Sequence, residues 1–535
     1  MWLLLLACAE PEPAGLPVPD SESDSAPPSD SDTPVVPPDV CDTLSLTRSA
    51  WADGDNTGLL NSVASDFSVE LIDGSTWTLS ENWTGCENLL VLPSEPKQNQ
   101  GFSEDVWASK RDFSAFFDLL PANTRLLFVG EAANADREEM LAELVDKVGD
   151  ALSDEQESWW YEGRFLVAKD RPGGLDNWLG DALSQPGWGI GIDRFQRIRY
   201  TGSYGDPARY DSGVGWFAPN IEMVANEAVY YNFEAEREAW VAKLDGQVLT
   251  VLDGVLVQDG SWAGVTTDAL VELPDLSGYD SLFLDLLSEC QGDGEYGDCP
   301  AWDYISWLQV CEPDGTGCVE LGRWITTYHR EGRWVHDVSP LLPLLGDGGR
   351  TKLFRYYSQQ PYETTLKLRF ADQGHADRPE ALEHLFNGGY LGTDYNLREP
   401  VSVEIPADVS RVELVTVLTG HGMDSVGNCA EFCEILHVFG IDGHDVEITF
   451  PIDDPERGCM SQVASGTVPN QYGTWWYGRN GWCPGREVGV QRRDVTGYAV
   501  PGATVEVSYD ATYRGADFTG GSANIVAESW LVYYR

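Results

Sequence analysis

Two carboxylates stand in cysteine-rich segments, where covalent bonds could hold a side chain for catalysis. Asp303 follows Trp302 shortly after Cys299, and Glu431 is the central residue of the segment Cys429–Cys433. A carboxylate can activate water, and an arginine or backbone N–H groups can stabilise charge that develops during a reaction. A bond across so few residues would force a tight loop around Glu431, which is the support that a catalytic side chain needs.

Each candidate also has a purely structural interpretation. An isolated aspartate on a loop between strands is usually a turn residue, so Asp303 by itself predicts little. Arg479 could form a surface ion pair, and Trp482 could pack in a core. His421 stands between two glycines and could line a site, whereas a histidine on an apolar strand, such as His437, is more often a hydrogen-bonded core residue.

The elements around these residues predict several domains. The chain has 535 residues, of which 42% are hydrophobic and 20 are tryptophan, so three or four cores can form. The 34 basic and 87 acidic residues give a formal charge of -53, which repels phosphate backbones and argues against a nucleic-acid partner. A solvated acidic surface is the simplest explanation of this charge.

The N-terminus is similar to a bacterial lipoprotein signal. Four leucines and Ala7 run into Cys8, the residue that would be acylated, although the apolar run is short and no basic residue precedes it. Residues 9–40 are rich in Pro, Ser, Asp and Glu and predict a disordered tether. We therefore expect an exported protein, either secreted or anchored to the cell envelope through a lipid on Cys8, its one membrane attachment.

The cysteine count agrees with export. Assigning Cys8 to lipid leaves ten of the 11 cysteines, an even number. Zinc is the competing explanation, but the sequence has no CxxC pair and a single CxxxC. Disulfides in an oxidising compartment are the better explanation.

The strand and helix patterns divide the rest of the chain. A hairpin over 66–79, strands over 89–92 and 126–130, a helix over 138–152 and a hairpin over 189–203 predict an α/β domain at 41–220. This order resembles the thioredoxin and peroxiredoxin fold. That fold carries its reactive thiolate after the strand equivalent to 89–92, where Pro93–Phe102 contains no cysteine. The domain is therefore expected to be redox-inactive.

A helix over 221–244 is expected to link this domain to an all-β region. Short alternating strands with Gly, Pro and Asp turns then predict two antiparallel β-sandwiches, at 245–385 and 386–535. The expected fold class is mainly β, with two jelly-roll-like sandwiches after an N-terminal α/β domain.

Four segments of this region resemble the peptide-N-glycosidase F family, in the family's order. They are Cys290–Tyr304, ending CPAWDY; Gly322–Tyr328 with His336–Ser339; Thr419–Cys433; and Gly458–Cys459 with Gly481–Gly485. The family folds as two eight-stranded jelly-roll-like sandwiches with the active site between them. The resemblance implies an amidase that hydrolyses the bond between asparagine and the first N-acetylglucosamine of an N-linked glycan. Its partners would be N-glycosylated proteins or peptides, and a monomer is expected.

The resemblance also implies residue roles. Asp303 and Glu431 match essential carboxylates, Arg479 matches an arginine beside that aspartate, and Trp302 and Trp482 match aromatic residues that line the cleft, where His421 could also lie. Disulfides Cys290–Cys299, Cys429–Cys433 and Cys459–Cys483 follow from the resemblance. Pairs Cys41–Cys86 and Cys311–Cys318 follow from proximity and parity.

The sequence departs from the family's pattern in its sugar contacts. A functional glutamate, and a tryptophan two residues later, align with Ser358 and Gln360, and a third aromatic position is Phe432. Glu363 lies five residues past Ser358, which on a single strand would place it on the opposite face. The sequence therefore predicts a retained amidase whose binding of the innermost sugars is altered at Ser358, Gln360 and Phe432.

Two other functions remain open at this point. The same double sandwich could bind glycans or glycopeptides without cleaving them. It could also be a copper-dependent monooxygenase, because peptidylglycine hydroxylating enzymes share the architecture and use about five histidines. The seven histidines here (329, 336, 375, 384, 421, 437 and 444) include no His-x-His pair, so no metal or other cofactor is expected.

Overall fold

A computed structural model describes residues 39–93, 113–130, 137–154, 156, 163–184, 189–202, 217–218, 220–258, 264–292, 294–295, 297–424, 429–450 and 456–535. Cys8, the tether up to residue 38 and most of the segment 93–102 lie outside the described residues, so the predictions made for them stay predictions. No helix within the described ranges is long and apolar enough to cross a membrane.

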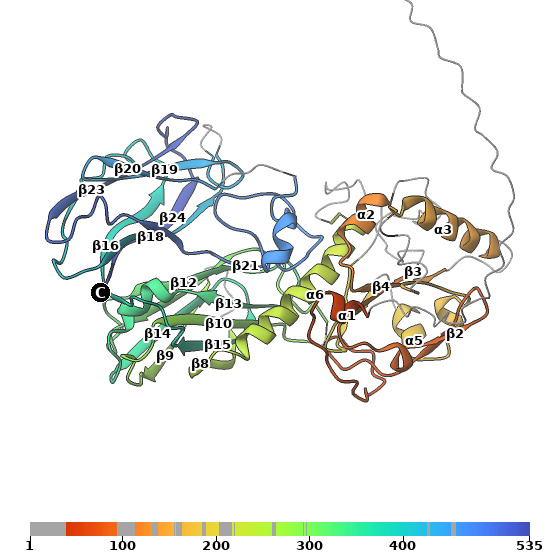
Figure 1. Cartoon of the computed structure of the whole chain (residues 1–535). Coiled ribbons are helices and arrows are strands. Elements are labelled where there is room, and N and C mark those ends of the chain that lie inside the picture. Colours follow the sequence, from red (N-terminus) through yellow and green to blue (C-terminus); the bar gives the residue numbers. More distant parts are fainter. Residues whose placement is uncertain are drawn as a thin grey trace, which may run out of the picture. The chain divides into compact units, whose positions relative to one another are not determined.

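The described chain begins with an α/β unit built on one sheet, coloured red to yellow in Figure 1. Its strands, in the order β5-β4-β3-β6-β7, are β3 (Asn88–Pro93), β4 (Thr124–Val129), β5 (Phe165–Ala168), β6 (Ile190–Ile192) and β7 (Ile198–Tyr200). β3, β4 and β5 are parallel, whereas β6 runs antiparallel to β3 and β7 antiparallel to β6. The helices are α1 (Val40–Thr43), α2 (Ser114–Leu119), α3 (Arg137–Ala151) and α5 (Trp178–Ser184), and a hairpin joins β1 (Ser68–Glu70) to β2 (Thr76–Thr78).

The central strand of this unit is buried on both faces, as an α/β sheet requires. Leu90 and Leu92 pack with residues of α2 and α3, whereas Leu89 and Val91 pack with residues of α5 and the hairpin. The predicted hairpins, strands and helix of 66–203 are confirmed within a few residues. The thioredoxin-like interpretation of the unit stays a prediction.

Helix α6 (Ile221–Val241) is part of two hydrophobic cores and does more than link domains. Asn220 caps it, because its side chain accepts a hydrogen bond of 2.7 Å from the Glu222 N–H. One face, including Ile221, packs in the core of the α/β unit. Met223 and Tyr230 on another face pack in the core of the first sandwich. The expected linker is therefore a shared structural element.

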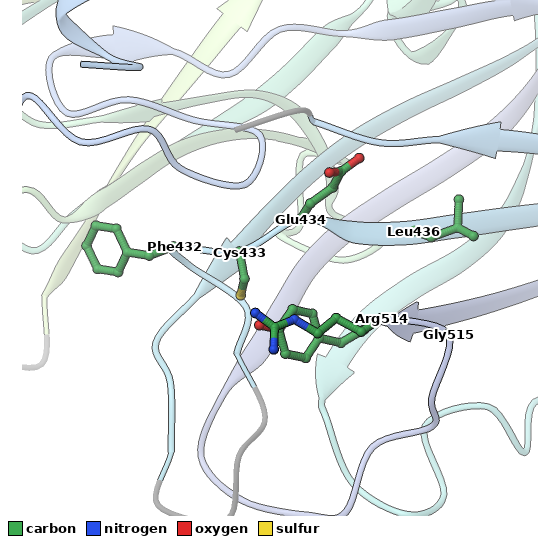
Figure 2. Close-up of a pocket in the computed structure, with 7 residues that line it drawn as sticks. Phe432, Cys433, Glu434, Leu436, Arg514 and Gly515 are labelled. Carbon is green, nitrogen blue, oxygen red and sulfur yellow. The ribbon is translucent and has the colours of Figure 1, made fainter. Parts of the chain in front are cut away.

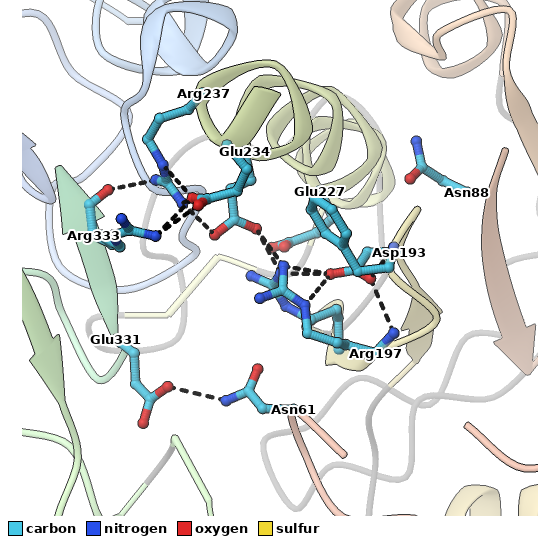
Figure 3. Close-up of polar contacts among 12 residues, drawn as sticks. Asn61, Asn88, Asp193, Arg197, Glu227, Glu234, Arg237, Glu331 and Arg333 are labelled. Atoms are coloured by element: carbon cyan, nitrogen blue, oxygen red, sulfur yellow. Dashed lines mark hydrogen bonds and ion pairs between the residues drawn. The ribbon is translucent and has the colours of Figure 1, made fainter. Parts of the chain in front are cut away.

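Buried ion pairs reinforce this helix (Figure 3). Glu234 of α6 lies 2.5 Å from Nη1 of Arg199 in β7, and both side chains are about nine-tenths buried. Glu227 of α6 lies 2.6 Å from Nη1 of Arg330 in the first sandwich. Arg237 donates to the backbone oxygen of Arg333 at 2.6 Å. These contacts fix the helix to strands on both sides of it.

The rest of the chain forms two β-sandwiches, and this part of the predicted fold class is confirmed. The first pairs sheet β13-β10-β15-β8 with sheet β21-β12-β11-β14-β9, and the second pairs β16-β24-β18-β22 with β17-β23-β19-β20. The bounds are β8 (Gly246–Val257), β9 (Val265–Glu272), β10 (Ser281–Glu289), β11 (Ile305–Cys311), β12 (Val319–Ile325), β13 (Gly332–Asp337), β14 (Thr351–Ser358), β15 (Tyr362–Ala371), β16 (Pro379–Tyr390), β17 (Val401–Glu404), β18 (Arg411–His421), β19 (Ile435–Ile441), β20 (His444–Ile448), β21 (Arg486–Glu487), β22 (Gln491–Asp494), β23 (Thr504–Tyr513) and β24 (Asn524–Tyr534). Short 3₁₀ helices cover 80–82, 172–174, 339–345 and 460–465.

The boundary between the sandwiches lies earlier than 385. β15 ends at Ala371 in the first sandwich, and β16 begins at Pro379 and pairs with β24 of the second. The segment 456–490 then returns to the first sandwich, where Trp475 and Trp476 join its core and β21 pairs with β12. A division at a single position cannot describe this exchange.

One sheet is buried on both faces and holds the sandwiches together. In β18, Leu414 and Leu418 pack in the core of the second sandwich. Val415 and Val417, on the opposite face, pack in the core of the first, and Trp530 of β24 joins them. The two sandwiches therefore share an apolar interface built on the two central strands of this sheet, β18 and β24.

Because the ion pairs at α6 are buried, replacing one of their arginines should destabilise the protein more than replacing an arginine of an exposed ion pair. Burial raises the pKa of Glu234, but Arg199, Arg197 and Arg237 outweigh burial and lower this pKa from 4.5 to about 2. Arg199→Met leaves a buried carboxylate short of its nearest cation, so the free energy of unfolding should fall by about 3 kcal/mol. Urea unfolding of the full chain, followed by tryptophan fluorescence, measures it.

The matched control is Arg355→Met, since Arg355 pairs with Asp268 where both side chains are about a third exposed. It should cost less than about 1 kcal/mol. The stabilisation from Glu234 is complete above pH 4.5 and is lost as the pH falls towards 2. Equal losses for the two variants at pH 7 would contradict the role given to this network.

Candidate active site

The Asp303 segment is held at the start of β11 by one threonine. Thr326 Oγ1 donates a hydrogen bond of 2.7 Å to the Trp302 oxygen and accepts one of 2.9 Å from the Tyr304 N–H. The Thr326 N–H in turn donates to the Tyr304 oxygen at 2.9 Å. The Cys290–Cys299 disulfide closes the loop just before this segment. Asp303 thus stands on a fixed backbone, with its side chain 14% exposed.

The Glu431 loop is braced by the Cys429–Cys433 disulfide. The Gly422 N–H donates to Glu431 Oε2 at 3.0 Å, and the Asn480 N–H donates to the Glu431 backbone oxygen at 2.8 Å. Gly420 must be glycine, because a Cβ there would lie 1.9 Å from the Ala430 oxygen. The glycines beside His421 therefore allow the end of β18 to approach this loop.

Arg479 joins the two carboxylates. Its Nη2 lies 3.3 Å from Asp303 Oδ2, and its Nε lies 3.3 Å from Glu431 Oε1. Nη2 also donates to Thr474 Oγ1 at 2.6 Å, and Nη1 donates to the Tyr477 oxygen at 3.1 Å. The side chain of Arg479 has no exposed surface. Asp303 comes from the first sandwich and Glu431 from the second, so this guanidinium spans them.

Two aromatic rings enclose the same guanidinium. The centre of the Arg479 guanidinium lies 4.6 Å from the Trp482 ring centroid and 4.9 Å from that of Phe432. Trp482 is 7% exposed, and its Nε1 donates to the Gly420 oxygen at 2.7 Å, so it packs against Arg479 more than it lines an open surface. Trp302, at 38% exposed, is the accessible aromatic side chain next to Asp303.

The Asp303 carboxyl has an unusual acidity. Burial raises its pKa from 3.8 to about 6, against the opposing effects of the Arg479 charge and a hydrogen bond from the Tyr328 hydroxyl. The neighbouring charge of Glu431 raises it further. A carboxylate with a pKa near 6 is a stronger base than an ordinary aspartate and still ionised at neutral pH, which suits a general base.

His421 is neutral in this environment. Its ring stacks on Trp482 with centroids 5.1 Å apart, and its Nε2 lies 2.8 Å from Thr419 Oγ1. Burial, helped by the charges of Arg323 and Arg479, lowers its pKa to about 3. His421 therefore carries no charge at the pH values where Asp303 titrates.

Ser358 and Gln360 lie apart from this constellation. Ser358 is the last residue of β14 and is 2% exposed, and its hydroxyl donates to the Gln360 backbone oxygen at 2.8 Å. Gln360 is 6% exposed, and its side chain donates to the Gln359 oxygen. In this arrangement neither side chain presents a group to a sugar.

Ser358 and Glu363 lie on different strands, so the prediction from their odd spacing along one strand was wrong. Ser358 ends β14, and Glu363 belongs to β15, which lies in the opposite sheet of the sandwich. The two residues do not share a strand, so an odd spacing says nothing about their faces. Glu363 pairs with Glu289 and Leu256, away from Ser358.

The five disulfides of the structure join the pairs expected from the sequence: Cys41–Cys86, Cys290–Cys299, Cys311–Cys318, Cys429–Cys433 and Cys459–Cys483. Sequence reasoning missed Thr326, Tyr328 and Thr474, which hold Asp303 and Arg479. Thr326 and Tyr328 belong to the Gly322–Tyr328 segment and come directly after β12. This position at the end of a strand was the signal that could have identified them.

The part of the chain that the structure describes contains no group of three His, Cys, Asp or Glu side chains placed to hold a metal ion. Burial lowers the pKa of His336 to about 4 and that of His437 to about 3. His437 Nδ1 lies 2.9 Å from the Tyr509 hydroxyl, and His384 Nε2 lies 2.9 Å from Glu528. His437 and His384 thus bond to neighbouring side chains, and His336 is buried beside Trp324, with ring centroids 6.4 Å apart.

Comparisons with known proteins agree with the predicted resemblance. Residues 392–532 match the family model "Peptide-N-glycosidase F, C terminal". The peptide-N(4)-(N-acetyl-beta-D-glucosaminyl)asparagine amidase F of Elizabethkingia miricola is 23% identical over 258 residues, which are 44% of this chain and 69% of that protein. The solved structure of a glycosylasparaginase from Flavobacterium meningosepticum is 18% identical and covers 54% of this chain and 96% of its own, with a TM-score of 0.43. A solved peptide-N(4)-(N-acetyl-beta-D-glucosaminyl)asparagine amidase is 19% identical with the same coverage and a TM-score of 0.45.

The threonine that holds the Asp303 segment provides a test of this local geometry. Thr326→Val keeps the volume of the side chain but leaves the Trp302 oxygen and the Tyr304 N–H without their bonds to the hydroxyl, which should lower the free energy of unfolding by about 1–3 kcal/mol. Thr250→Val, at an exposed position of β8, should change it by less than about 0.5 kcal/mol. Urea unfolding of both variants measures the difference, and similar values would argue against this anchoring.

Proposed function

We propose that this chain is a peptide-N-glycosidase, which hydrolyses the amide bond between an asparagine side chain and the first N-acetylglucosamine of an N-linked glycan. The observation that supports this best is the position of Arg479, 3.3 Å from a carboxylate oxygen of each of Asp303 and Glu431. These are the residues that match the family's functional positions. The match of residues 392–532 to the C-terminal family model supports the same activity.

Asp303 is the general base in this proposal. Its carboxylate takes a proton from a water molecule, whose oxygen attacks the carbonyl carbon of the asparagine side chain. The bond between this carbon and the amide nitrogen then breaks, and the proton passes to the leaving nitrogen. The products are an aspartate side chain and a glycosylamine. The pKa of about 6 lets Asp303 accept this proton and return it near neutral pH.

Glu431 orients the substrate amide. Its Oε2 already accepts from the Gly422 N–H and its Oε1 from Arg479, so the carboxylate is fixed before substrate arrives. A remaining lone pair can accept the N–H of the scissile amide. Because the carboxylate does not have to reorganise, this contact favours one orientation of the amide relative to Asp303.

Arg479 is a positioning residue in this proposal. Its side chain has no exposed surface, so it acts on the substrate through the two carboxylates that it holds. It also lowers the pKa of Asp303, which keeps this group ionised at a lower pH than burial alone would allow. Trp482 and Phe432 fix the guanidinium from its faces.

Trp302 is the proposed contact for the first sugars, because its exposed ring can stack on the apolar face of a pyranose. Ser358 and Gln360, where the family has a glutamate and a tryptophan, are buried and bonded to their own loop. Binding of the innermost sugars should therefore differ from the family's pattern. In this proposal His421 supports the site indirectly, because its ring stacks on Trp482, which packs against Arg479.

The proposed substrates are N-glycosylated proteins or peptides outside the cytoplasm. Ten cysteines form disulfides, which agrees with an exported protein. A lipid anchor at Cys8, a monomeric state and a redox-inactive α/β unit belong to this proposal. Within that unit Cys41 and Cys86 are bonded to each other.

Charge-removing variants test the catalytic assignment. Asp303→Asn and Glu431→Gln keep side-chain volume, and each should lower kcat/KM by at least about a hundredfold, since general-base catalysis contributes about 10²–10⁴. The substrate is a denatured N-glycoprotein, and the readouts are released glycan and the conversion of Asn to Asp. Glu363→Gln, an exposed carboxylate of β15, is the control and should retain wild-type activity.

Two outcomes would reject the proposal. Wild-type release of glycan by Asp303→Asn would show that Asp303 is not the base. Tight binding of a glycopeptide by the wild-type chain without any cleavage would favour a glycan-binding protein.

The pH dependence tests the role of Arg479. The kcat/KM of the wild-type protein should fall as the pH decreases through about 6, because Asp303 then becomes protonated. Arg479→Met removes a charge that lowers the pKa of Asp303, so the acidic limb should move to higher pH. Arg479→Lys keeps a charge and should move the limb less. An unchanged limb in Arg479→Met, with reduced activity at all pH values, would indicate a purely structural role.

A further inference from the structure

A pocket of about 450 Å³ opens beside the Glu431 loop. It lies where β19 begins and β23 ends, which is where Ile435 pairs with Tyr513. Figure 2 shows Phe432, Cys433 and Glu434 coming from the start of β19, and Arg514 and Gly515 from the end of β23. The lining residues are Phe432, Cys433, Glu434, Leu436, Tyr513, Arg514 and Gly515.

This pocket shares one residue with the proposed active site. Phe432 lines it and also lies 4.9 Å from the guanidinium of Arg479. Glu431 is the preceding residue, and Cys433, the following one, is bonded to Cys429. A group that occupies the pocket would therefore lie one residue away from the carboxylate that is proposed to orient the scissile amide.

The lining combines apolar and charged groups. Leu436, Phe432 and Tyr513 are partly exposed, and Glu434 and Arg514 are exposed. The guanidinium of Arg514 lies 4.9 Å from the centroid of the Tyr513 ring. The backbone of Arg514 has a φ of 53°. Both Arg514 and Glu434 line the pocket with exposed side chains, so a ligand can reach both charges.

The side chains next to Asp303 and those of the pocket next to Glu431 suit different parts of a glycopeptide. This difference indicates which part occupies the pocket. Trp302, the exposed indole that suits a sugar ring, lies next to Asp303. The pocket begins at Phe432, the residue after Glu431, and none of its lining residues comes from the Asp303 segment. In the substrate, the glycan is attached to the nitrogen of the scissile amide and the polypeptide to its carbonyl side. The two therefore extend from this amide in different directions. If the glycan lies over Trp302, the polypeptide passes Glu431 and reaches the pocket.

We propose that this pocket binds the polypeptide next to the glycosylated asparagine, and that Arg514 and Glu434 determine which flanking residues are preferred. The proposal rests on the peptide-N-glycosidase activity proposed above. Arg514 would attract acidic side chains of the glycopeptide, and Glu434 basic ones. Leu436 and Tyr513 would contact the aliphatic parts of the same segment. Hydrolysis would then depend on peptide sequence as well as on the glycan.

Charge reversal tests this preference. Glycopeptides with one glycan and either Asp or Lys on each side of the glycosylated asparagine are compared by kcat/KM. Arg514→Glu should lower the ratio of the Asp peptide to the Lys peptide by about fivefold, and Glu434→Lys should raise it by a similar factor, as expected for partly exposed ion pairs. Arg493→Glu, the same charge change on an exposed residue of β22, should leave the ratio within about twofold.

A binding measurement separates this inference from the activity itself. Asp303→Asn is titrated with a fluorescent glycopeptide, and two competitors are added: the same peptide without glycan, and the free glycan. The peptide without glycan should compete with the fluorescent glycopeptide for binding to Asp303→Asn. Its affinity should be lower for the double variant that also carries Arg514→Glu. Competition by free glycan that is weakened by Arg514→Glu would assign the pocket to sugar and overturn the inference.

Two further results would distinguish failure of the proposed function from failure of the pocket assignment. If the wild-type chain releases no glycan from any substrate, the proposed function fails, and the competition experiment still decides whether the pocket binds polypeptide. If the wild-type chain cleaves both glycopeptides and neither charge reversal changes their ratio, the activity stands and the pocket assignment is wrong.

Discussion

The buried charge of Arg479 is the constraint on which the candidate site depends. A guanidinium without exposed surface must be matched by hydrogen bonds and opposite charge, because an unpaired buried cation is strongly destabilising. Asp303, Glu431, Thr474 and the Tyr477 oxygen provide this match. The two carboxylates are consequently held close together, although like charges repel. Arg479 is thus a structural requirement, and its charge limits the rise in the pKa of Asp303 that burial causes.

This arrangement requires the two sandwiches to be fixed against each other. Asp303 belongs to the first, Glu431 to the second, and Arg479 to the segment that returns from the second to the first. A small shift between the sandwiches would lengthen the 3.3 Å contact between Arg479 and Glu431. The sheet that contains β18 and β24 prevents such a shift, since its side chains pack into both cores. The rigidity of the site therefore comes from a large apolar interface.

The cysteine-rich segments made Asp303 and Glu431 recognisable in the sequence, because their spacing predicts braced loops. Ser358 and Gln360 were assigned to sugar binding by alignment alone, and the sequence could not show that β14 ends at Ser358. The boundary between the sandwiches could be predicted only to a range, because strands with similar turns continue on both sides of residues 372–378. Helix α6 was interpreted as a linker because it lies between the α/β and all-β regions, and the sequence could not show that Glu227 and Glu234 are buried. Their partners, Arg330 and Arg199, lie far away in the sequence.

The double packing of helix α6 also has a consequence for how the chain folds. Its residues Met223 and Tyr230 belong to the same core as Met460 and Val463 of the 3₁₀ helix 460–465, which contacts α6. The ribosome must therefore synthesise most of both sandwiches before this face of the helix is fully covered. Until then, the finished α/β unit carries an apolar surface that could associate with other chains. A chaperone that protects this helix during synthesis and export would improve the yield of folded protein, whatever the final stability of the native state.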